Sequence, residues 1–210
     1  MSRTTSSATL SRTALRVLAV VVFGMVAAAL GIAIHQSATS TASPSAGSPN
    51  EVALGPADAT SIEQGGLPDG VAAFDEGYPG VDRLDPDLLS ALQEATTDAA
   101  VDGVDIVIKS GWRSREYQEQ LQAEAVVRYG SEEEAARWAA SPDTSAHVTG
   151  DAIDLGPWKA LDWLAQRGAR YGLCQTYGNE PWHYELRPEA IDSGCPTMYQ
   201  DPSHDPRLQP

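Results

Sequence analysis

Two residues in the middle of the chain, His147 and Asp154, are of types that bind metal ions and stand seven positions apart. Gly150 lies between them and allows the backbone to turn or to approach another segment closely. We expect the chain to turn there and to enter a short apolar strand that points Asp154 back toward His147. Imidazole and carboxylate groups are ligands of zinc, whereas a carboxylate buried without a partner would be costly. His147 and Asp154 are therefore candidate metal ligands.

A second pair, Glu180 and His183, stands three residues apart at the entrance of another predicted strand. With His147 and Asp154, His183 would complete a set of two imidazoles and one carboxylate, which leaves the fourth position of a zinc ion open, as in hydrolytic zinc enzymes. We therefore predict one Zn2+, with Glu180 as the general base that takes a proton from water and passes it to the leaving amine. Glu185 lies on the same strand face as His183 and could orient its ring.

Each of these residues also has a purely structural interpretation. The three candidate ligands could form a hydrogen-bonded core network, and Glu180 could be a salt-bridge partner. Singly, each residue would favour that interpretation, but the joint spacing favours a metal site. The other two histidines, His35 and His204, lie beside an apolar N-terminal run and in the C-terminal tail.

Three motifs occur in one order along the chain. Residues 110–118 read S-G-W-R-S-R-E-Y-Q, residues 145–154 follow S-x-H-x-x-G-x-A-x-D, and residues 180–183 follow E-x-W-H. Together they resemble the zinc D-alanyl-D-alanine carboxypeptidases of the VanY type, a family similar in its metal core to lysostaphin-type enzymes and the hedgehog domain. Any one motif alone would be a weaker signal than the ordered set.

The resemblance implies further site residues. It implies that Arg113 polarises the scissile carbonyl and stabilises the oxyanion, a role that suits a permanently charged, forked donor. It also implies that Ser145 and Gln118 contact the peptide and that Trp182 shapes the pocket floor. Three alternatives remain open: Arg113 could pair with Asp154, Ser145 could only shape the turn, and Gln118 could be a surface glutamine.

The elements that must position these residues form an α+β pattern. Short strands are predicted at 104–108, 152–155 and 182–186. One helix is predicted to begin after an N-cap at Asp85, and three others at 114–129, 131–140 and 158–171. The resemblance implies a small central antiparallel sheet flanked by helices, as in hedgehog and D-Ala-D-Ala-peptidase folds.

The chain divides by composition into four parts. We expect an Arg-bearing start with an apolar segment at 1–35, a disordered Ser/Ala/Pro-rich stalk at 36–70, the zinc peptidase domain at 71–196 and an irregular Pro-rich tail at 197–210. The stalk cannot bury enough apolar surface to offset the entropy of ordering it.

An apolar run at residues 17–34 follows Arg3, Arg12 and Arg16. At ~1.5 Å per residue this run just crosses a bilayer core of roughly 30 Å, and the arginines should stay in the cytoplasm. We expect a signal-anchor with an extracellular C-terminal domain, or a secreted protein if the segment is a cleaved signal peptide. Either way, the domain is exported.

Cys174 and Cys195 are the only cysteines. In an exported chain they predict one disulfide, which closes a loop of about 20 residues and contributes ~3 kcal/mol in the chain-entropy model. The alternative is a pair of unconnected thiols. A zinc role is disfavoured because the spacing does not match CxxC-type sites.

Charge excludes one class of partner. After residue 36 the chain holds 11 basic and 29 acidic residues. A surface of that charge repels phosphate backbones, so we expect no nucleic acid partner. We further expect a monomer whose membrane contact, if the N-terminal segment is retained, is through residues 17–34.

These observations predict a zinc metallopeptidase that hydrolyses peptidoglycan stem peptides as a D-Ala-D-Ala carboxypeptidase. One alternative is an L,D- or cross-bridge endopeptidase with the same zinc chemistry. Another, of a different class, is a zinc-stabilised wall-binding module without turnover. The presence of both Glu180 and Arg113 favours turnover over binding alone.

Overall fold

The computed structural model describes residues 59–209. The predicted N-terminal segment at 1–35, the apolar run within it and the greater part of the predicted stalk lie outside these residues. Among the helices of residues 59–209, none combines the length and the apolar character needed to cross a membrane.

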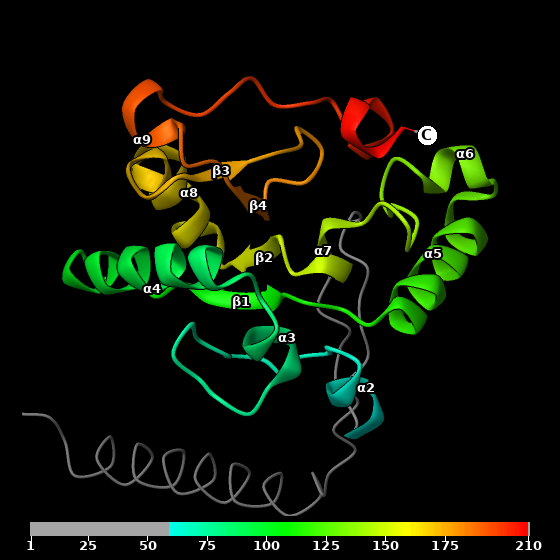
Figure 1. Ribbon diagram of the computed structural model, residues 1–210, viewed down its shortest axis with the longest axis horizontal. Helices are drawn as coiled ribbons and strands as arrows, with labels where there is room; N and C mark the ends of the chain where they lie inside the picture. The colour runs from blue at the N-terminus through cyan, green and yellow to red at the C-terminus, as the bar shows by residue number, and fades with distance from the viewer. Residues whose placement is uncertain (1–58, 210) are drawn as a thin grey trace, which may run out of the picture. The chain divides into compact units, whose positions relative to one another are not determined.

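A four-stranded sheet forms the centre of the domain, in the order β1-β2-β4-β3, with every neighbouring pair antiparallel. Its strands are β1 (Val107–Ser110), β2 (Ala152–Gly156), β3 (Leu173–Gln175) and β4 (His183–Leu186). The predicted α+β class and the small antiparallel sheet are confirmed (Figure 1). The first strand begins later than the predicted 104–108, and β3 was not predicted.

Alternation along the two central strands separates a core face from a polar face. Ile153 and Tyr184, which pair across β2 and β4, are buried in the hydrophobic core together with Leu155. Their neighbours Asp154 and His183, also directly paired, point to the opposite face because successive side chains in a strand alternate. The sheet thus builds the core on one side and presents the candidate ligands on the other.

Most of the helix residues in the hydrophobic core come from two helices. The first, α4 (Pro86–Val101), begins at the predicted cap, where the Asp85 side chain accepts hydrogen bonds from the backbone N–H groups of Asp87 and Leu88. The second, α8 (Trp158–Arg167), continues into a 3-10 turn, η1 (Gly168–Tyr171). In these two helices, the residues with no exposed surface are Leu88, Leu92, Ala95, Ala99 and Ala160.

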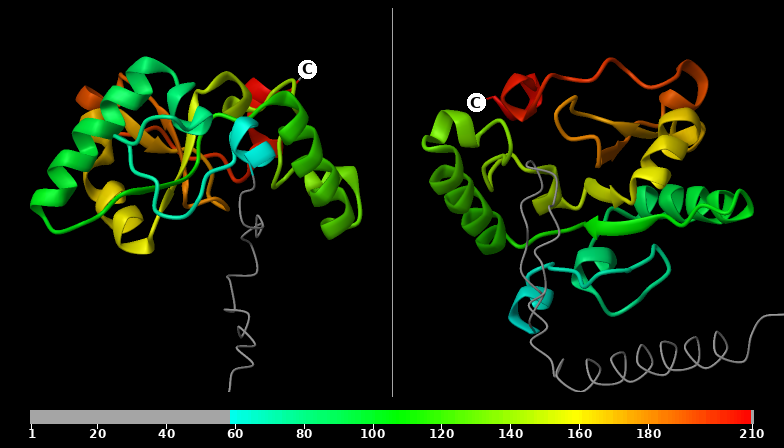
Figure 2. Two further views of the ribbon diagram at one scale, coloured as in Figure 1. Left: turned by 90° about the horizontal axis from the view of Figure 1, so that it is seen from below. Right: turned by 180° about the vertical axis from the view of Figure 1, so that it is seen from behind.

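A second group of helices lies at the other end of the sheet from α4 and α8 (Figures 1 and 2). It comprises α5 (Arg115–Tyr129), capped by the Ser114 hydroxyl, and the shorter α6 (Glu132–Ala135). The prediction for α5 is confirmed to within one residue. The predicted helix at 131–140 ends early, and turns follow it.

Ordered structure also begins before the predicted domain start at Val71. Helix α2 (Ala59–Glu63) lies inside the segment assigned to the stalk, and α3 (Pro79–Asp82) follows. Gly65 explains this order: it has φ of 104°, and a Cβ there would lie 2.1 Å from the carbonyl oxygen of Trp112. Close backbone packing, which apolar composition does not reveal, holds this segment on the domain.

The C-terminal segment returns from the sheet toward α6 (Figure 1). It follows α9 (Ala190–Ser193) and contains two 3-10 turns, η2 (Pro202–His204) and η3 (Pro206–Leu208). The predicted disulfide is confirmed: Cys174 in β3 is bonded to Cys195. The segment is irregular, as predicted, but it is not a loose tail, because Asp201 and Asp205 within it are fully buried.

Candidate active site

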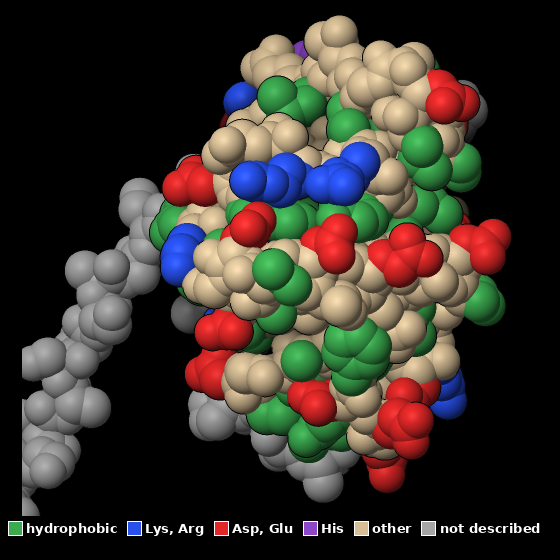
Figure 3. Space-filling view, turned by 90° about the vertical axis from the view of Figure 1, so that its left-hand side faces the viewer, with side chains coloured by type: hydrophobic (Ala, Val, Ile, Leu, Met, Phe, Trp, Pro, Cys, Tyr) green, Lys and Arg blue, Asp and Glu red, His purple; other side chains and the backbone are tan. Residues whose placement is uncertain are grey.

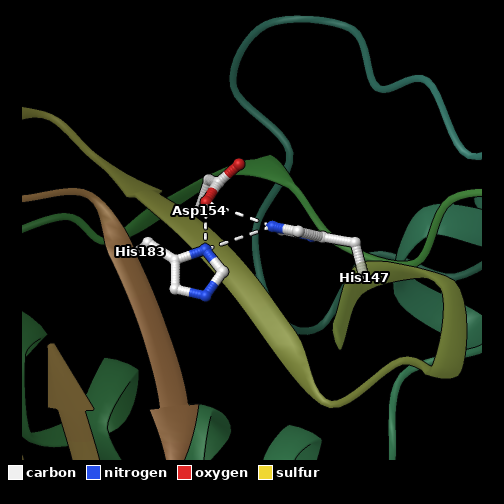
Figure 4. Close-up of side chains that lie close together, drawn as sticks. All are labelled: His147, Asp154 and His183. Carbon is white, nitrogen blue, oxygen red and sulfur yellow. Dashed lines mark hydrogen bonds and ion pairs between the residues drawn. The ribbon is translucent and has the colours of Figure 1, made fainter. Parts of the chain in front are cut away.

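The three predicted ligands, His147, Asp154 and His183, come together on the polar face of the sheet (Figure 4). His147 Nε2 lies 3.4 Å from Asp154 Oδ1, His183 Nδ1 lies 3.2 Å from the same oxygen, and the two ring nitrogens are 3.3 Å apart. All three side chains are buried. The structure therefore places one atom of each residue at the corner of a small triangle.

Two kinds of local structure produce this triangle. Asp154 and His183 are directly opposed in the β2–β4 ladder, so strand pairing sets their separation. His147 stands on the one-turn helix α7 (Ala146–Thr149), which ends at Gly150 with a left-handed φ of 86°. A Cβ at Gly150 would lie 2.4 Å from the carbonyl oxygen of Arg83, so glycine is required for both the turn and the close approach.

The outward nitrogens of both histidines have hydrogen-bond acceptors. His147 Nδ1 donates to the Gly111 carbonyl oxygen at 2.8 Å, and His183 Nε2 donates to Glu185 Oε1 at 3.4 Å. In the neutral form that can bind a metal, the acceptor holds the proton on the outer nitrogen, so the lone pair of each ring points inward, to Nε2 of His147 and Nδ1 of His183. The orienting role that strand alternation suggested for Glu185 agrees with this contact.

The donor set fits a tetrahedral metal ion. Metal–nitrogen and metal–oxygen bonds of ~2.1 Å place the ligand atoms of a tetrahedral zinc site about 3.4 Å from one another. The observed separations of 3.2, 3.3 and 3.4 Å match that edge length. Two imidazoles and one carboxylate leave a fourth position for water or substrate.

Arg113 is paired with the ligand Asp154, which is the alternative left open by the sequence. Its Nη2 donates to Asp154 Oδ2 at 2.7 Å, its Nε to Ser110 Oγ at 2.8 Å and its Nη1 to Gln118 Oε1 at 3.1 Å. These contacts use three of the five guanidinium N–H groups. The remaining ones have no hydrogen-bond partner within residues 59–209, so the ion pair does not prevent a second role.

Gln118 is buried, with 1% of its surface exposed, and is not the surface glutamine that one interpretation suggested. Its carbonyl accepts from Arg113, and its amide nitrogen donates to the Ala140 carbonyl oxygen at 2.9 Å. In the structure, Gln118 therefore holds Arg113 and the segment after α6 in place.

Glu180 lies beside the triangle, with its Oε2 3.8 Å from His183 Nδ1. Burial raises the pKa of Glu180 to about 7, although the nearby His183 acts in the opposite direction. A carboxyl group with a pKa near neutrality is suited to take up and release a proton. Its position and its environment therefore both suit a general base.

The electrostatics of the triangle keep Asp154 ionised. Burial opposes its charge, but His147, His183 and Arg113 together hold the pKa of Asp154 well below its usual range. Burial also opposes charge on the histidines and lowers the pKa of His147. Hydrogen bonds to Asp154 and Glu185 outweigh burial at the second ring and raise the pKa of His183 to about 10.

The other two predicted site residues flank the cluster. Ser145 precedes α7 and is buried, but its hydroxyl makes no capping hydrogen bond, so the turn-shaping alternative has no support. Trp182 is half-buried and packs against the hydrophobic core next to His183. Contact of either residue with substrate remains a prediction.

Residues near the site that the sequence did not identify come from the C-terminal half. The Tyr177 ring centroid lies 4.9 Å from that of His183, and Glu185 receives hydrogen bonds from Arg187 and Arg207. Arg207 is 22 positions from Glu185. No spacing rule or motif links residues that far apart, so no sequence signal pointed to it.

Two solved structures of peptidases are among those similar to this chain. A vancomycin-resistance D,D-pentapeptidase VanY variant in complex with Zn(II) is 27% identical, with a TM-score of 0.49, over 53% of this chain and 75% of its own. The L,D-carboxypeptidase LdcB is 22% identical, with a TM-score of 0.50, over 60% of this chain and 68% of its own. The second likeness supports the fold alone.

A curated relative from Enterococcus faecalis, named D-alanyl-D-alanine carboxypeptidase, is 30% identical over 128 residues. The alignment covers 49% of this chain and 48% of the relative, so the chain spans about half the length of that protein. Residues 81–189 match the sequence profile of the VanY family, described as D-alanyl-D-alanine carboxypeptidase. That match includes every predicted ligand, and the chain belongs to the VanY family of D-alanyl-D-alanine carboxypeptidases.

Proposed function

We propose that this chain is a zinc-dependent peptidase that removes the terminal D-alanine from peptidoglycan stem peptides. One observation carries the proposal: three inward-facing ligand atoms at tetrahedral spacing, with a buried glutamate beside them, in a chain of the VanY family. A core network without a metal would not need this spacing or the outward hydrogen bonds of both rings.

Each residue has a distinct task in this proposal. His147, Asp154 and His183 hold the ion, which when bound supplies Lewis-acid chemistry at the scissile carbonyl and lowers the pKa of water. Glu180 accepts a proton from the attacking water and delivers it to the nitrogen of the departing D-alanine. Arg113 directs its unpaired N–H groups at the oxygen on which negative charge develops.

The substrate assignment is supported by the family and by the name of the curated relative. A stem peptide ending in D-Ala-D-Ala has a free carboxylate and a single scissile amide close to it. The buried Ser145, whose hydroxyl does not cap α7, offers a hydrogen bond to such a peptide.

We further propose that the domain acts outside the cytoplasm, either tethered through residues 17–34 or released. The Cys174–Cys195 disulfide supports this location because structural disulfides persist in oxidising compartments. Fractionation of cells, with protease treatment of intact cells, tests it. Degradation of the domain by external protease is expected, and full protection would contradict export.

Mass spectrometry of purified muropeptides tests the reaction. The protein is incubated with stem pentapeptides, with and without a chelator, and zinc is then restored. Loss of one alanine residue, abolished by the chelator and recovered with zinc, is the expected result. A larger fragment would indicate an endopeptidase or dipeptidase instead, and retention of peptide without any product would indicate a binding module.

A further inference from the structure

The C-terminal segment, residues 196–209, follows the part of the chain that matches the family profile, which ends at residue 189. It nevertheless contacts the candidate active site. Cys195 immediately precedes this segment in sequence. It is joined by the disulfide to Cys174 in β3, so the start of the segment is attached to the sheet.

Arg207 in this segment makes a forked contact with Glu185. Its Nη1 donates to Glu185 Oε2 at 2.7 Å and its Nη2 to Oε1 at 3.2 Å. A two-point contact of this kind fixes the plane of a carboxylate as well as its position. Glu185, which is only 2% exposed, uses the same Oε1 to accept the hydrogen bond from His183 Nε2. Arg207 therefore binds Glu185, which in turn binds the candidate metal ligand His183.

Asp205 holds Arg207 in that position and also contacts Tyr177, which lies beside His183. Its carboxylate accepts hydrogen bonds from Arg207 Nε at 2.9 and 3.0 Å. It also accepts from the Tyr177 hydroxyl at 3.1 Å, and the Tyr177 ring packs beside the ring of His183. Asp205 is fully buried, so its charge requires these partners.

The segment also pairs with the loop that leads to Glu180. The backbone N–H of Tyr199 donates to the Thr176 carbonyl oxygen at 3.0 Å, and the Gly178 N–H donates to the Tyr199 carbonyl oxygen at 2.8 Å. The Asn179 N–H donates to the carbonyl oxygen of Gln200 at 3.2 Å. Three consecutive backbone contacts thus attach the segment immediately before the candidate base.

A further contact ties the segment to the region after α6. Buried Asp201 accepts from Arg137 Nε at 3.1 Å, and the Asn179 side chain donates to the Arg137 carbonyl oxygen at 2.7 Å. The segment therefore bridges both sides of the site, between the β3–β4 connection and the helices around α6.

We propose that the C-terminal segment supports metal binding, and that Arg207 is a positioning residue that orients His183 through Glu185. The inference rests on the proposed function, because it assigns His183 to a metal ion. Partners of a ligating histidine fix its ring orientation, and their loss typically weakens metal binding by about 10–100-fold. Arg187 also donates to Glu185 Oε2, at 2.5 Å, but from a single nitrogen, so it does not fix the plane of the carboxylate.

The test measures zinc affinity by competition with a chromophoric chelator, and the visible spectrum of the cobalt-substituted protein, in the full chain. The variants are Arg207→Ala, Arg207→Lys, Glu185→Gln and the double variant Arg207→Ala with Glu185→Gln. Arg167→Ala is the matched control. It also removes one positive charge from an ion pair, but this pair, with Asp102, is exposed, and Arg167 lies at the end of α8.

We expect Arg207→Ala to weaken zinc binding about tenfold and to alter the cobalt spectrum, with Arg167→Ala unchanged. Lysine keeps the charge but lacks the fork, so Arg207→Lys should not restore the affinity. In the double variant, loss of Arg207 should add little to the effect of Glu185→Gln, because both act through one path.

Two results would overturn the inference: unchanged zinc affinity in Arg207→Ala, or full, independent additivity of the two substitutions. Recovery by Arg207→Lys would also overturn it, since charge alone would then suffice. Thermal unfolding of each variant shows that it is folded, and Arg207→Lys keeps an ion pair for Asp205 if alanine is not tolerated. Wild-type protein that binds no zinc would instead overturn the proposed function.

Discussion

Asp154 directs its two carboxylate oxygens to different partners. Oδ1 faces both histidines, and Oδ2 accepts from Arg113. The arginine therefore neutralises the oxygen that faces away from the ligand cluster and leaves the other to bind a metal through a single atom. At the scale of single residues, this makes Arg113 both a support for a ligand and a candidate for substrate activation.

Replacement of Arg113 by lysine tests both roles. A single ammonium group cannot reach Ser110, Gln118 and Asp154 together in a planar fork. We expect kcat to fall about 10^2–10^3-fold, as for loss of one oxyanion donor, with a smaller loss of zinc affinity. Steady-state kinetics and chelator competition measure the two effects. Normal kcat with weakened zinc binding would restrict Arg113 to the structural role.

Replacement of Glu180 by glutamine separates metal binding from proton transfer. Glutamine keeps the shape of the side chain but cannot accept a proton. We expect zinc affinity to be retained and kcat to fall by roughly 10^2–10^4-fold, the contribution typical of a general base. Metal analysis together with D-alanine release checks this. A variant with ordinary turnover would show that another group takes the proton.

At the scale of elements, α7 is the part of the site whose position depends most on tertiary contacts. It is one turn long, it carries His147, and it ends where Gly150 meets the backbone of Arg83. A helix this short has little stability of its own. Its position must therefore come from the packing of the residues at its ends.

Alanine at Gly150 tests this dependence, with Gly130 as the matched control. Both glycines have φ of 86°, but a Cβ at Gly130 meets nothing within 4 Å, whereas at Gly150 it meets a carbonyl oxygen. We expect Gly130→Ala to cost about 1 kcal/mol in the free energy of unfolding, and Gly150→Ala to cost more and to weaken zinc binding. Urea unfolding and chelator competition report the two quantities. Equal costs with unchanged zinc affinity would contradict the role given to α7.

Local signals predicted the elements that carry them. Asp85 before Pro86 marked the start of α4, and Ser114 marked α5. Strand β3 was missed because it has only three residues, and α6 ends early because a turn at residues 136–138 follows it directly. Short elements are fixed by tertiary contacts rather than by their own pattern.

The site divides in the same way. The ligands and Glu180 follow from residue type and spacing, and Glu185 follows from strand alternation. The pairing of Gln118 with Arg113 and the contact of Arg207 with Glu185 depend on the tertiary fold. The sequence places Arg113 and Gln118 in one motif but does not predict their hydrogen bond, and nothing in the spacing of Glu185 and Arg207 predicts their contact.

The charge of the whole molecule is strongly negative, with a net charge of −15. On the face drawn in Figure 3, acidic side chains are spread widely and basic ones gather in a row across the upper half. The net charge of the chain still predicts that nucleic acid is not a partner.

The disulfide links two parts of the molecule that are 21 positions apart in sequence. Replacing Cys174 and Cys195 together by serine should lower the free energy of unfolding by about 3 kcal/mol. Because the link anchors the C-terminal segment, we also expect faster proteolysis after residue 195. Urea unfolding and limited proteolysis measure both effects, with reduced wild-type protein as the control. Unchanged stability would indicate that other contacts hold the segment.

The direct pairing of Asp154 with His183 has a consequence for folding. A slip of β4 by one residue against β2 would turn His183 to the opposite face of the sheet. Only the native alignment of the two strands therefore assembles the chelating pair, and a bound ion selects that alignment over its neighbours. Metal binding at this site would therefore also stabilise the native register of β2 and β4.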